Sequence, residues 1–350
     1  MKSSAKPAHS FCHPRLTTAV GNLATGAGLQ QALATAADAA PDGKLAAVVN
    51  CAAISFPGEC ETRPSETKGV NVPSLLVDSL CRHAQSTRWV PLLVQLSTDQ
   101  VYGDCRNDGN PSLWHEADAI APVNMYGAQK ADAENMIEAR YPHHVILRSS
   151  VMYGPLPEML GPVKGERFLQ FCNNVLDGKN DVAFFDDEWR NFVSVTDVAA
   201  AVAASVRLWP PMRIVTKEKS LSGGGDIYDV AFASNNVISV EARASSDDGT
   251  AAAGGNINSR SSSTKVTHRR RAINVAGPER MSRADFARAL ARARSLPQGA
   301  VKTVSVRVGG TSRPMTSPSD SSVDVTMMRD VLGVEPKSVA DVLQGLISGK

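Results

Sequence analysis

The chain lacks several features that would point to particular classes of protein. It has no apolar run as long as 18 residues, so the sequence predicts no transmembrane helix. Its 37 Lys and Arg residues nearly balance 35 Asp and Glu residues, and the net charge of +2 gives no argument for a nucleic-acid or membrane partner. The six cysteines form no Cys-x-x-Cys pair and have no histidine cluster beside them. We therefore expect no metal site and a reducing compartment, the cytoplasm.

Acidic residues are missing from the N-terminal stretch. Residues 1–37 contain no Asp or Glu but several Lys, Arg, Ser, Thr and Ala residues. This composition is also typical of transit peptides, so organelle import stays open beside a cytoplasmic location. No apolar signal-peptide core is present, and residues 16–37 are equally compatible with ordinary folded structure. We expect residues 1–44 to form a partly disordered N-terminal segment.

Short apolar runs then alternate with helical patterns. Strands are predicted near 45–49, 89–96, 144–148 and 182–185, and helices near 65–85, 125–140 and 195–208, the last capped by Thr196 or Asp197. This alternation predicts an α/β fold with a parallel sheet between helices. Polar residues follow three of the strands directly: Asn50, Ser97–Asp99 and Ser149–Ser150. Ligands bind at the carboxyl ends of such strands, so these residues are candidates for a functional site.

The C-terminal part divides into two regions. Residues 216–269 are rich in Gly, Ala and Ser and are predicted to be a low-complexity, largely disordered insertion, with a short strand conceivable at 237–240. Order resumes at 272–275 and continues with a helix over 283–294 capped by Ser282, a strand over 301–308, and two short helices near 324–332 and 337–347. We expect residues 270–350 to form a smaller α+β subdomain.

The segment Tyr126-Gly-Ala-Gln-Lys130 carries the chemistry most clearly. Residues four apart share one helix face, so the Lys130 ammonium is expected to lie under the phenol and lower its pKa. Such a tyrosine can pass a proton to or from a carbonyl or hydroxyl oxygen. Thr98, at a strand end, can donate to the same oxygen. Taken singly, Tyr126 could equally be a half-buried surface tyrosine and Thr98 a satisfied strand-end hydroxyl.

Several motifs occur in an order that resembles a known family. They are Asn50–Ala53, Asn71, Ser97–Gly103, Pro122–Tyr126 with Lys130, Leu147–Ser150, Tyr153–Gly154, Arg190–Asp197, and Ile273–Glu279 with Ser282. Together they resemble the extended short-chain dehydrogenase/reductase superfamily and, within it, the RmlD-like dTDP-4-dehydrorhamnose reductase family. The resemblance covers about 45–210 and 272–345.

The resemblance implies a Rossmann-like core over 45–210 that binds NADP or NAD, with part of the substrate region at 151–192. It assigns catalytic roles to Thr98, Tyr126 and Lys130. It places these residues at the cofactor: Asn50, Ala52, Ala53, Asn71, Ser97, Tyr126, Lys130, Ser149 and Ser150. It places these residues at the substrate: Thr98, Asp99, Val151, Arg190 and Arg313. Hydride would pass to the 4-keto group of a nucleotide-linked sugar, and Tyr126 would protonate the resulting alkoxide.

The sequence departs from this family at its start. The family begins with a strand and a G-x-x-G-x-x-G turn that holds the cofactor pyrophosphate at a helix N-terminus. Here Gly21, Gly26 and Gly28 have a different spacing, and no apolar strand precedes them. We expect the first strand and the glycine-rich loop to be missing, with weak or absent cofactor binding. An incomplete gene model, an inactive isoform and an unforeseen source of the missing part all stay open.

A second departure bears on the substrate. Val151 replaces a tryptophan usual in bacterial rhamnose-forming reductases, so the sugar pocket is expected to differ. The alternative to a reductase is a non-catalytic protein that resembles the regulatory beta subunit of methionine adenosyltransferase and binds a partner enzyme. The expected partners are thus a nucleotide-sugar substrate and either a second copy of the chain or a synthetase of that type.

Overall fold

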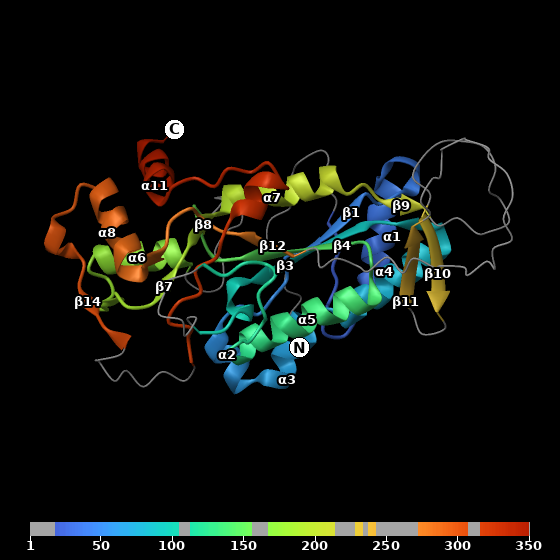
Figure 1. Ribbon diagram of the computed structural model, residues 1–350, viewed down its shortest axis with the longest axis horizontal. Helices are drawn as coiled ribbons and strands as arrows, with labels where there is room; N and C mark the ends of the chain where they lie inside the picture. The colour runs from blue at the N-terminus through green and yellow to red at the C-terminus, as the bar shows by residue number, and fades with distance from the viewer. Residues whose placement is uncertain are drawn as a thin grey trace, which may run out of the picture.

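The computed structural model describes residues 18–104, 113–155, 167–213, 228–233, 237–242, 272–306 and 316–349. At its centre, four strands form a sheet in the order β1-β3-β4-β12. They are β1 (Ala47–Asn50), β3 (Leu92–Thr98), β4 (His144–Ser149) and β12 (Ala272–Val275). Every neighbouring pair is parallel, which confirms the predicted α/β fold with a parallel sheet (Figure 1).

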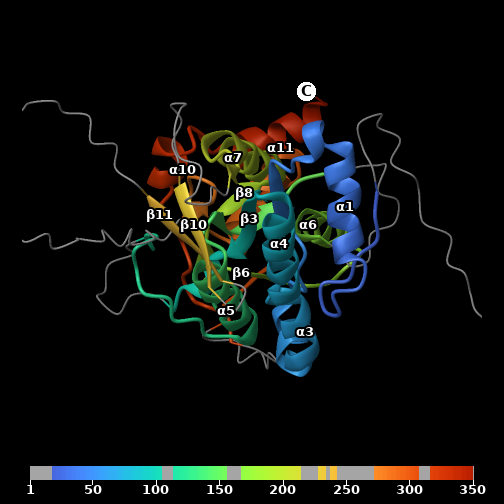
Figure 2. The ribbon, with the colours of Figure 1, turned by 90° about the vertical axis from the view of Figure 1, so that its right-hand side faces the viewer.

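Helices cover both faces of this sheet, and the side chains of β3 alternate between them. Leu92 and Val94 pack in one core with α7 (Val195–Leu208) and α10 (Thr326–Asp330). Leu93 packs in a second core with α1 (Leu29–Ala39), α4 (Ser74–Thr87) and α5 (Met125–Arg140) (Figure 2). The central strands are therefore buried, and side chains at the strand ends are the ones a ligand can approach.

The strand β1 differs from its neighbours because it lies at the edge of the sheet. Among the described residues its one strand partner is β3. Three of its four residues are not buried, and Val49 is 39% exposed. An edge strand leaves a row of backbone N–H and C=O groups unpaired along one side.

Local capping explains where the main helices begin. Asn124 caps α5 by accepting a hydrogen bond from the Gly127 N–H at 2.9 Å. Ser194 caps α7 in the same way through Asp197 N–H at 3.0 Å, so the predicted caps Thr196 and Asp197 are wrong. Ser282 caps α8 (Arg283–Ala293) in a reciprocal capping box, as predicted.

Two predicted elements are shorter or more divided than expected. The helix predicted over 65–85 is two helices, α3 (Pro64–Asn71) and α4, because Pro73 cannot supply the N–H that a continuous helix needs. A further helix, α2 (Pro57–Thr62), was not predicted. Of the strand predicted over 301–308, the described residues 301–306 contain β14 (Thr303–Val304), which pairs with β6 (Phe184–Phe185), and residues 307–308 lie outside the described residues. Alternation alone does not make a strand where no neighbouring strand continues the pairing.

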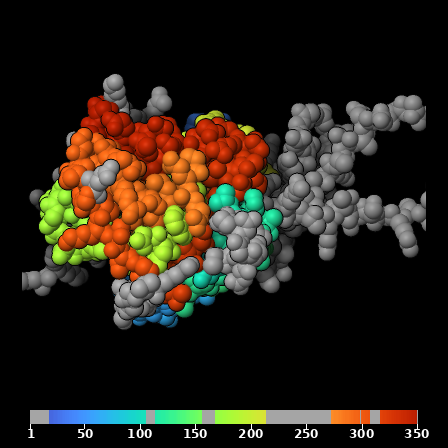
Figure 3. Space-filling model, turned by 60° about the vertical axis from the view of Figure 1, so that its left-hand side comes forward, coloured from blue at the N-terminus to red at the C-terminus, as the bar shows by residue number. Residues whose placement is uncertain are grey.

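A third core lies beyond the carboxyl ends of the sheet, on the left of Figure 1. It is built by β5 (Val151–Tyr153), β8 (Phe192–Ser194), α6 (Phe168–Leu176), α8 and α11 (Val339–Ser348). The Phe286 ring lies 5.0 Å from that of Tyr153 and 4.8 Å from that of Phe192. Figure 3 shows that segments from residues 167–200, 272–306 and 316–349 together form the surface on this side. Residues far apart in the sequence thus build one lobe beside the sheet.

The remaining strands form short pairs. They are β2 (Trp89–Val90) with β9 (Met212–Arg213), β7 (Trp189–Arg190) with β13 (Met281–Ser282), and β10 (Tyr228–Ala233) with β11 (Val237–Ala242). The described residues also contain three 3-10 turns: η1 (Pro41–Gly43), η2 (Asp99–Val101) and η4 (Gln298–Ala300). The β10–β11 hairpin lies within the range predicted to be largely disordered; the rest of 216–269 lies outside the described residues. No described helix has the length and apolarity needed to cross a bilayer.

Candidate active site

The strand register brings the candidate residues to one edge of the sheet. Thr98 lies opposite Ser149, and both end their strands. Asn50 ends β1 opposite Gln95, so β1 stops short of the level that Thr98 reaches. Asn50, Thr98 and Ser149 therefore share the carboxyl edge, although the β1 part of that edge is recessed.

The first turn of α5 places Tyr126 against this edge. Tyr126 is 7% exposed, and its phenol interacts with the side chain of Thr98. The next residue is glycine because the helix backbone touches η2: a Cβ on Gly127 would lie 2.2 Å from the Gln100 carbonyl oxygen. This close approach fixes how α5 sits above the end of β3.

The electrostatics of the phenol differ from the expectation. Burial raises the pKa of Tyr126 well above its ordinary value, and the nearby Asp99 and Cys60 raise it further, while the Thr98 side chain lowers it. The Lys130 ammonium is not among the charges that shift this pKa. The predicted lowering of the Tyr126 pKa by Lys130 is therefore wrong. The phenol is held in its protonated form.

Lys130 is buried one helical turn further on, with 2% of its surface exposed. Its Nζ donates to the Leu96 carbonyl oxygen at 2.6 Å. Burial lowers the pKa of Lys130 to about 8, although Glu134 and Cys51 oppose this shift. An ammonium has three protons, so the bond to Leu96 leaves two for other acceptors.

The Asp99 carboxylate accepts hydrogen bonds from hydroxyl groups in three parts of the chain. Its Oδ1 accepts from Thr98 Oγ1 at 3.1 Å, and its Oδ2 accepts from Ser150 Oγ at 3.0 Å and Ser321 Oγ at 2.9 Å. The residue is 1% exposed. Asp99 thus ties the ends of β3 and β4 to the C-terminal segment, while its predicted contact with substrate stays a prediction.

Ser97 points to the opposite side of β3 from Thr98, into a buried ionic network. Its Oγ donates to Glu134 Oε1 at 2.5 Å. Arg148 Nη2 donates to Glu134 Oε2 at 2.7 Å, and both side chains of this ion pair are fully buried. Arg148 Nη1 also donates to the Tyr102 hydroxyl at 2.8 Å. The network holds α5 against β3 and β4.

The two asparagines predicted at the cofactor are engaged inside the protein. Asn50 Nδ2 donates to Gln95 Oε1 at 2.8 Å. Asn71 accepts from the Ile54 N–H at 2.8 Å and donates to Gln129 Oε1 at 2.8 Å. They shape the loop after β1, where Ala52 is exposed and Ala53 is half-buried.

The remaining predicted residues are placed as follows. Ser149 Oγ donates to the Ser150 carbonyl oxygen at 3.0 Å. Val151 is half-buried at the start of β5. Arg190 is 1% exposed, and its Nη2 donates to Ser317 Oγ at 3.1 Å while its Nε has no partner in the described part of the chain. Arg313 lies outside the described residues.

The described residues fit a nicotinamide cofactor at one end only. Tyr126, Lys130 and the loop after β1 provide the protonated phenol, the ammonium and an exposed backbone. A turn containing glycines does precede α1. However, its Gly26 N–H already donates to the Asn22 carbonyl oxygen at 2.8 Å, within the turn itself. No strand leads into that turn within residues 18–46. The described residues therefore contain no strand-to-helix cradle for a pyrophosphate.

Four residues of the site were not predicted from the sequence. Ser321 donates a hydrogen bond to Asp99, and Asn191 accepts one from the Val323 N–H. In both cases the partner is distant in sequence, so no local pattern identifies these two residues. Glu61 accepts from the Met125 N–H at 2.8 Å, at the start of the helix that carries Tyr126. Gly127 could have been found, because a glycine beside a candidate catalytic residue in a helix signals close backbone approach.

The fold and site define a class. A parallel sheet with helices on both faces, with polar residues at its carboxyl edge, is a Rossmann-type α/β fold. The model of the RmlD substrate binding domain family matches residues 23–219, more than half of the chain. The chain therefore belongs to the RmlD substrate binding domain family.

Relatives and solved structures agree with this placement. The dTDP-4-dehydrorhamnose reductase of Sinorhizobium fredii is 27% identical over 203 residues, which are 56% of this chain and 60% of that protein. The chain thus spans less than two thirds of that relative. Methionine adenosyltransferase 2 subunit beta of Pongo abelii is 28% identical over 112 residues, 32% of this chain and 31% of that protein. The structure of dTDP-4-dehydrorhamnose reductase from Bacillus anthracis, solved in complex with NADP, superposes with a TM-score of 0.63 at 15% identity, covering 94% of this chain and 87% of that one.

Proposed function

We propose that the protein is an NAD(P)H-dependent reductase that acts on the 4-keto group of a nucleotide-linked sugar. The observation that carries this proposal is the buried, protonated Tyr126 phenol beside Thr98, one helical turn from Lys130. A protonated acid at the carboxyl edge of a parallel sheet suits protonation of an oxygen that has just received a hydride.

Each residue of the trio has a distinct task. Tyr126 gives its phenolic proton to the oxygen of the reduced carbonyl; with a raised pKa the phenol is protonated at neutral pH. Thr98 holds the same oxygen in place, and Lys130 offers its remaining protons to a cofactor ribose. The nicotinamide group, when bound, supplies the hydride. The other cofactor contacts that we propose are from Asn50, Ala52, Ala53, Asn71, Ser97, Ser149 and Ser150.

The substrate class follows the named activity of the relatives. Asp99, Val151, Arg190 and Arg313 are the residues that we propose to lie around the nucleotide sugar. We place this substrate region at 151–192 and 270–350, beside a cofactor core at 45–210, and a homodimer is the proposed assembly. The described cysteines Cys51, Cys60, Cys81 and Cys172 form no disulfide among the described residues, which supports a reducing compartment such as the cytoplasm.

Calorimetry with NADPH and NADH, followed by a turnover assay with dTDP-4-dehydrorhamnose, tests the proposal. We expect saturable binding of one cofactor and oxidation of that cofactor when the sugar is added. Absence of binding at sub-millimolar cofactor would exclude the reductase activity for this chain. Sedimentation in the same buffer measures the assembly.

A non-catalytic regulatory subunit is the second candidate. It is favoured by the methionine adenosyltransferase relative and by the lack of a pyrophosphate cradle among the described residues. A pull-down with a purified methionine adenosyltransferase catalytic subunit distinguishes the two. Capture without cofactor turnover would support the regulatory role, and no capture would remove it.

A further inference from the structure

The N-terminus of α5 is held by a residue from a distant helix. The first N–H groups of any helix lack partners within the helix. In α5 the Asn124 side chain accepts the Gly127 N–H, and Glu61 Oε1 accepts the Met125 N–H at 2.8 Å. Met125 directly precedes Tyr126, so the carboxylate acts on the turn that carries the phenol. A negative charge at this end also interacts favourably with the helix dipole.

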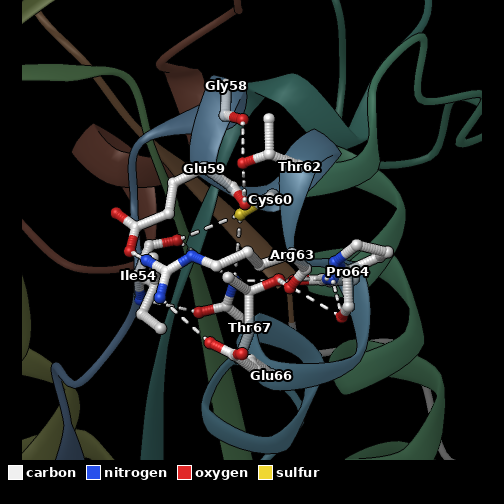
Figure 4. Close-up of polar contacts among 11 residues, drawn as sticks. Ile54, Gly58, Glu59, Cys60, Thr62, Arg63, Pro64, Glu66 and Thr67 are labelled. Carbon is white, nitrogen blue, oxygen red and sulfur yellow. Dashed lines mark hydrogen bonds and ion pairs between the residues drawn. The ribbon is translucent and has the colours of Figure 1, made fainter.

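Glu61 lies in α2, which together with α3 forms a platform. Polar contacts among other residues of the platform hold these two helices together (Figure 4). Arg63 lies between Glu59 and Glu66 and pairs with both, with 2.9 Å from its Nη1 to Glu66 Oε2. Cys60 Sγ contacts the Ile54 carbonyl oxygen at 3.4 Å, which joins α2 to the loop after β1. The contacts within the platform therefore fix the position of the helix that carries Glu61.

The same platform contacts α5 at a second position, beside Lys130. The buried amide of Gln129 donates from Nε2 to the Pro64 carbonyl oxygen at 3.0 Å and to Thr67 Oγ1 at 3.0 Å. Its Oε1 accepts from Asn71 Nδ2 at 2.8 Å. The helix is thus fixed just before Tyr126 and just before Lys130. On its other side, Gly127 leaves no room between α5 and the Gln100 carbonyl oxygen.

We propose that Glu61 is a positioning residue for Tyr126: by holding the Met125 N–H, its carboxylate sets the rotation of the first turn of α5 and thereby keeps the phenol against Thr98. The consequence for turnover rests on the proposed reductase function. The consequence for the phenol itself does not, because it concerns the ligand-free protein.

The test compares Glu61→Ala and Glu61→Gln with Glu66→Ala in the full chain. Glu66 has a similar side chain on the same platform but pairs with Arg63 at the surface, so it is the matched control. Three quantities are measured: amide hydrogen exchange along α5, the Tyr126 pKa by NMR of 13C-labelled tyrosine with Tyr126→Phe for assignment, and kcat and KM for NADPH oxidation.

For Glu61→Ala we expect exchange in the first turn of α5 to quicken about tenfold, in line with the loss of one charge-assisted hydrogen bond, while the middle of α4 is unchanged. The Tyr126 pKa falls toward its ordinary value, because the loosened phenol leaves its buried place beside Asp99 and Cys60. In turnover kcat falls and KM for NADPH stays the same. Glu61→Gln keeps an acceptor oxygen and restores most of each property.

Two results would overturn the proposal: unchanged exchange and phenol pKa in Glu61→Ala, or exchange that quickens equally in every helix. If Glu61→Ala does not fold, Glu61→Asp withdraws the carboxylate by one methylene and is judged by the same criteria. A wild-type protein that does not oxidise NADPH would defeat the proposed function alone, because the exchange and phenol readouts still decide the role of Glu61.

Discussion

The two sides of the carboxyl edge differ in how deeply their side chains are buried. On the side of β3 and β4, Thr98, Tyr126, Lys130 and Asp99 are buried, and a fully buried Arg148–Glu134 ion pair supports the helix behind them. On the side of β1, the strand is an edge strand with Val49 exposed, and Cys51 and Ala52 lie at the surface. Under the proposed function, the half that would handle the proton is buried and preorganised, whereas the half that would receive the cofactor is more exposed.

This difference separates two questions that are usually asked together. Under the proposed function, proton donation would depend on contacts that lie within the described chain. Cofactor affinity would depend on the β1 side, where Cys51 and Ala52 are exposed. Changes on the two sides are therefore expected to affect different measurements.

The largest expected effect is on the proton-transfer half. Tyr126→Phe removes the phenolic proton and keeps the ring, so turnover should fall about 10²–10⁴-fold, the usual contribution of general acid catalysis. Cofactor affinity measured by calorimetry should stay within about twofold, because the phenyl ring keeps the packing. Equal loss of binding and turnover would mean that the two halves are not separable.

Lys130 should make stability depend on pH. Its pKa in the folded protein is about 8 against a reference value of 10.5, so the folded state binds fewer protons than the unfolded state between these values. Stability contributed by this residue therefore rises from pH 8 to 10.5, by an amount on the order of 3 kcal/mol. Chemical denaturation of wild type and Lys130→Met across this range measures it. A stability difference that does not change with pH would show that the ammonium is not buried.

Gly127 should tolerate no side chain. A Cβ there would lie 2.2 Å from the Gln100 carbonyl oxygen, so Gly127→Ala must shift α5 and should cost about 1–3 kcal/mol of unfolding free energy. Gly69→Ala in α3 is the matched control, since its nearest neighbour, Ala24 Cβ, is 3.4 Å away. The control should be neutral or stabilise by up to about 1 kcal/mol through helix propensity. Similar melting temperatures for the two variants would argue against the close approach.

The smallest effect should come from β1. Val94→Ala in the fully buried β3 should cost about 1–3 kcal/mol, whereas Val49→Ala in β1 should cost less than about 0.5 kcal/mol. Urea unfolding of both variants gives the comparison directly. An equal cost would indicate that another segment covers β1.

The sequence was informative where structure depends on local pattern. The apolar runs that became β3 and β4, and the extent of the helix α5 near 125–140, are visible without any tertiary information. The same patterns misplaced the cap of α7, because Ser194, Thr196 and Asp197 all suit that position and backbone geometry decides among them. Pro73 could have divided the helix predicted over 65–85, but the long apolar periodicity outweighed it.

The parts of the site that depend on packing could not be predicted. The contact between Asp99 and Ser321 joins residues that are far apart in the sequence, and the contact between Glu61 and Met125 joins two helices. The direction of the Tyr126 pKa shift could also not be predicted from the sequence. Spacing indicated a nearby lysine, but burial and the Asp99 carboxylate dominate in the folded protein.

The most direct test of the central claim is the Tyr126 pKa in the ligand-free protein. NMR titration of 13C-labelled tyrosine, assigned with Tyr126→Phe, measures it without cofactor or substrate. A preorganised, buried acid predicts a pKa clearly above the ordinary value of 10.0. A value at or below 10.0 would mean that the phenol is exposed or paired with a cation, and would contradict the account.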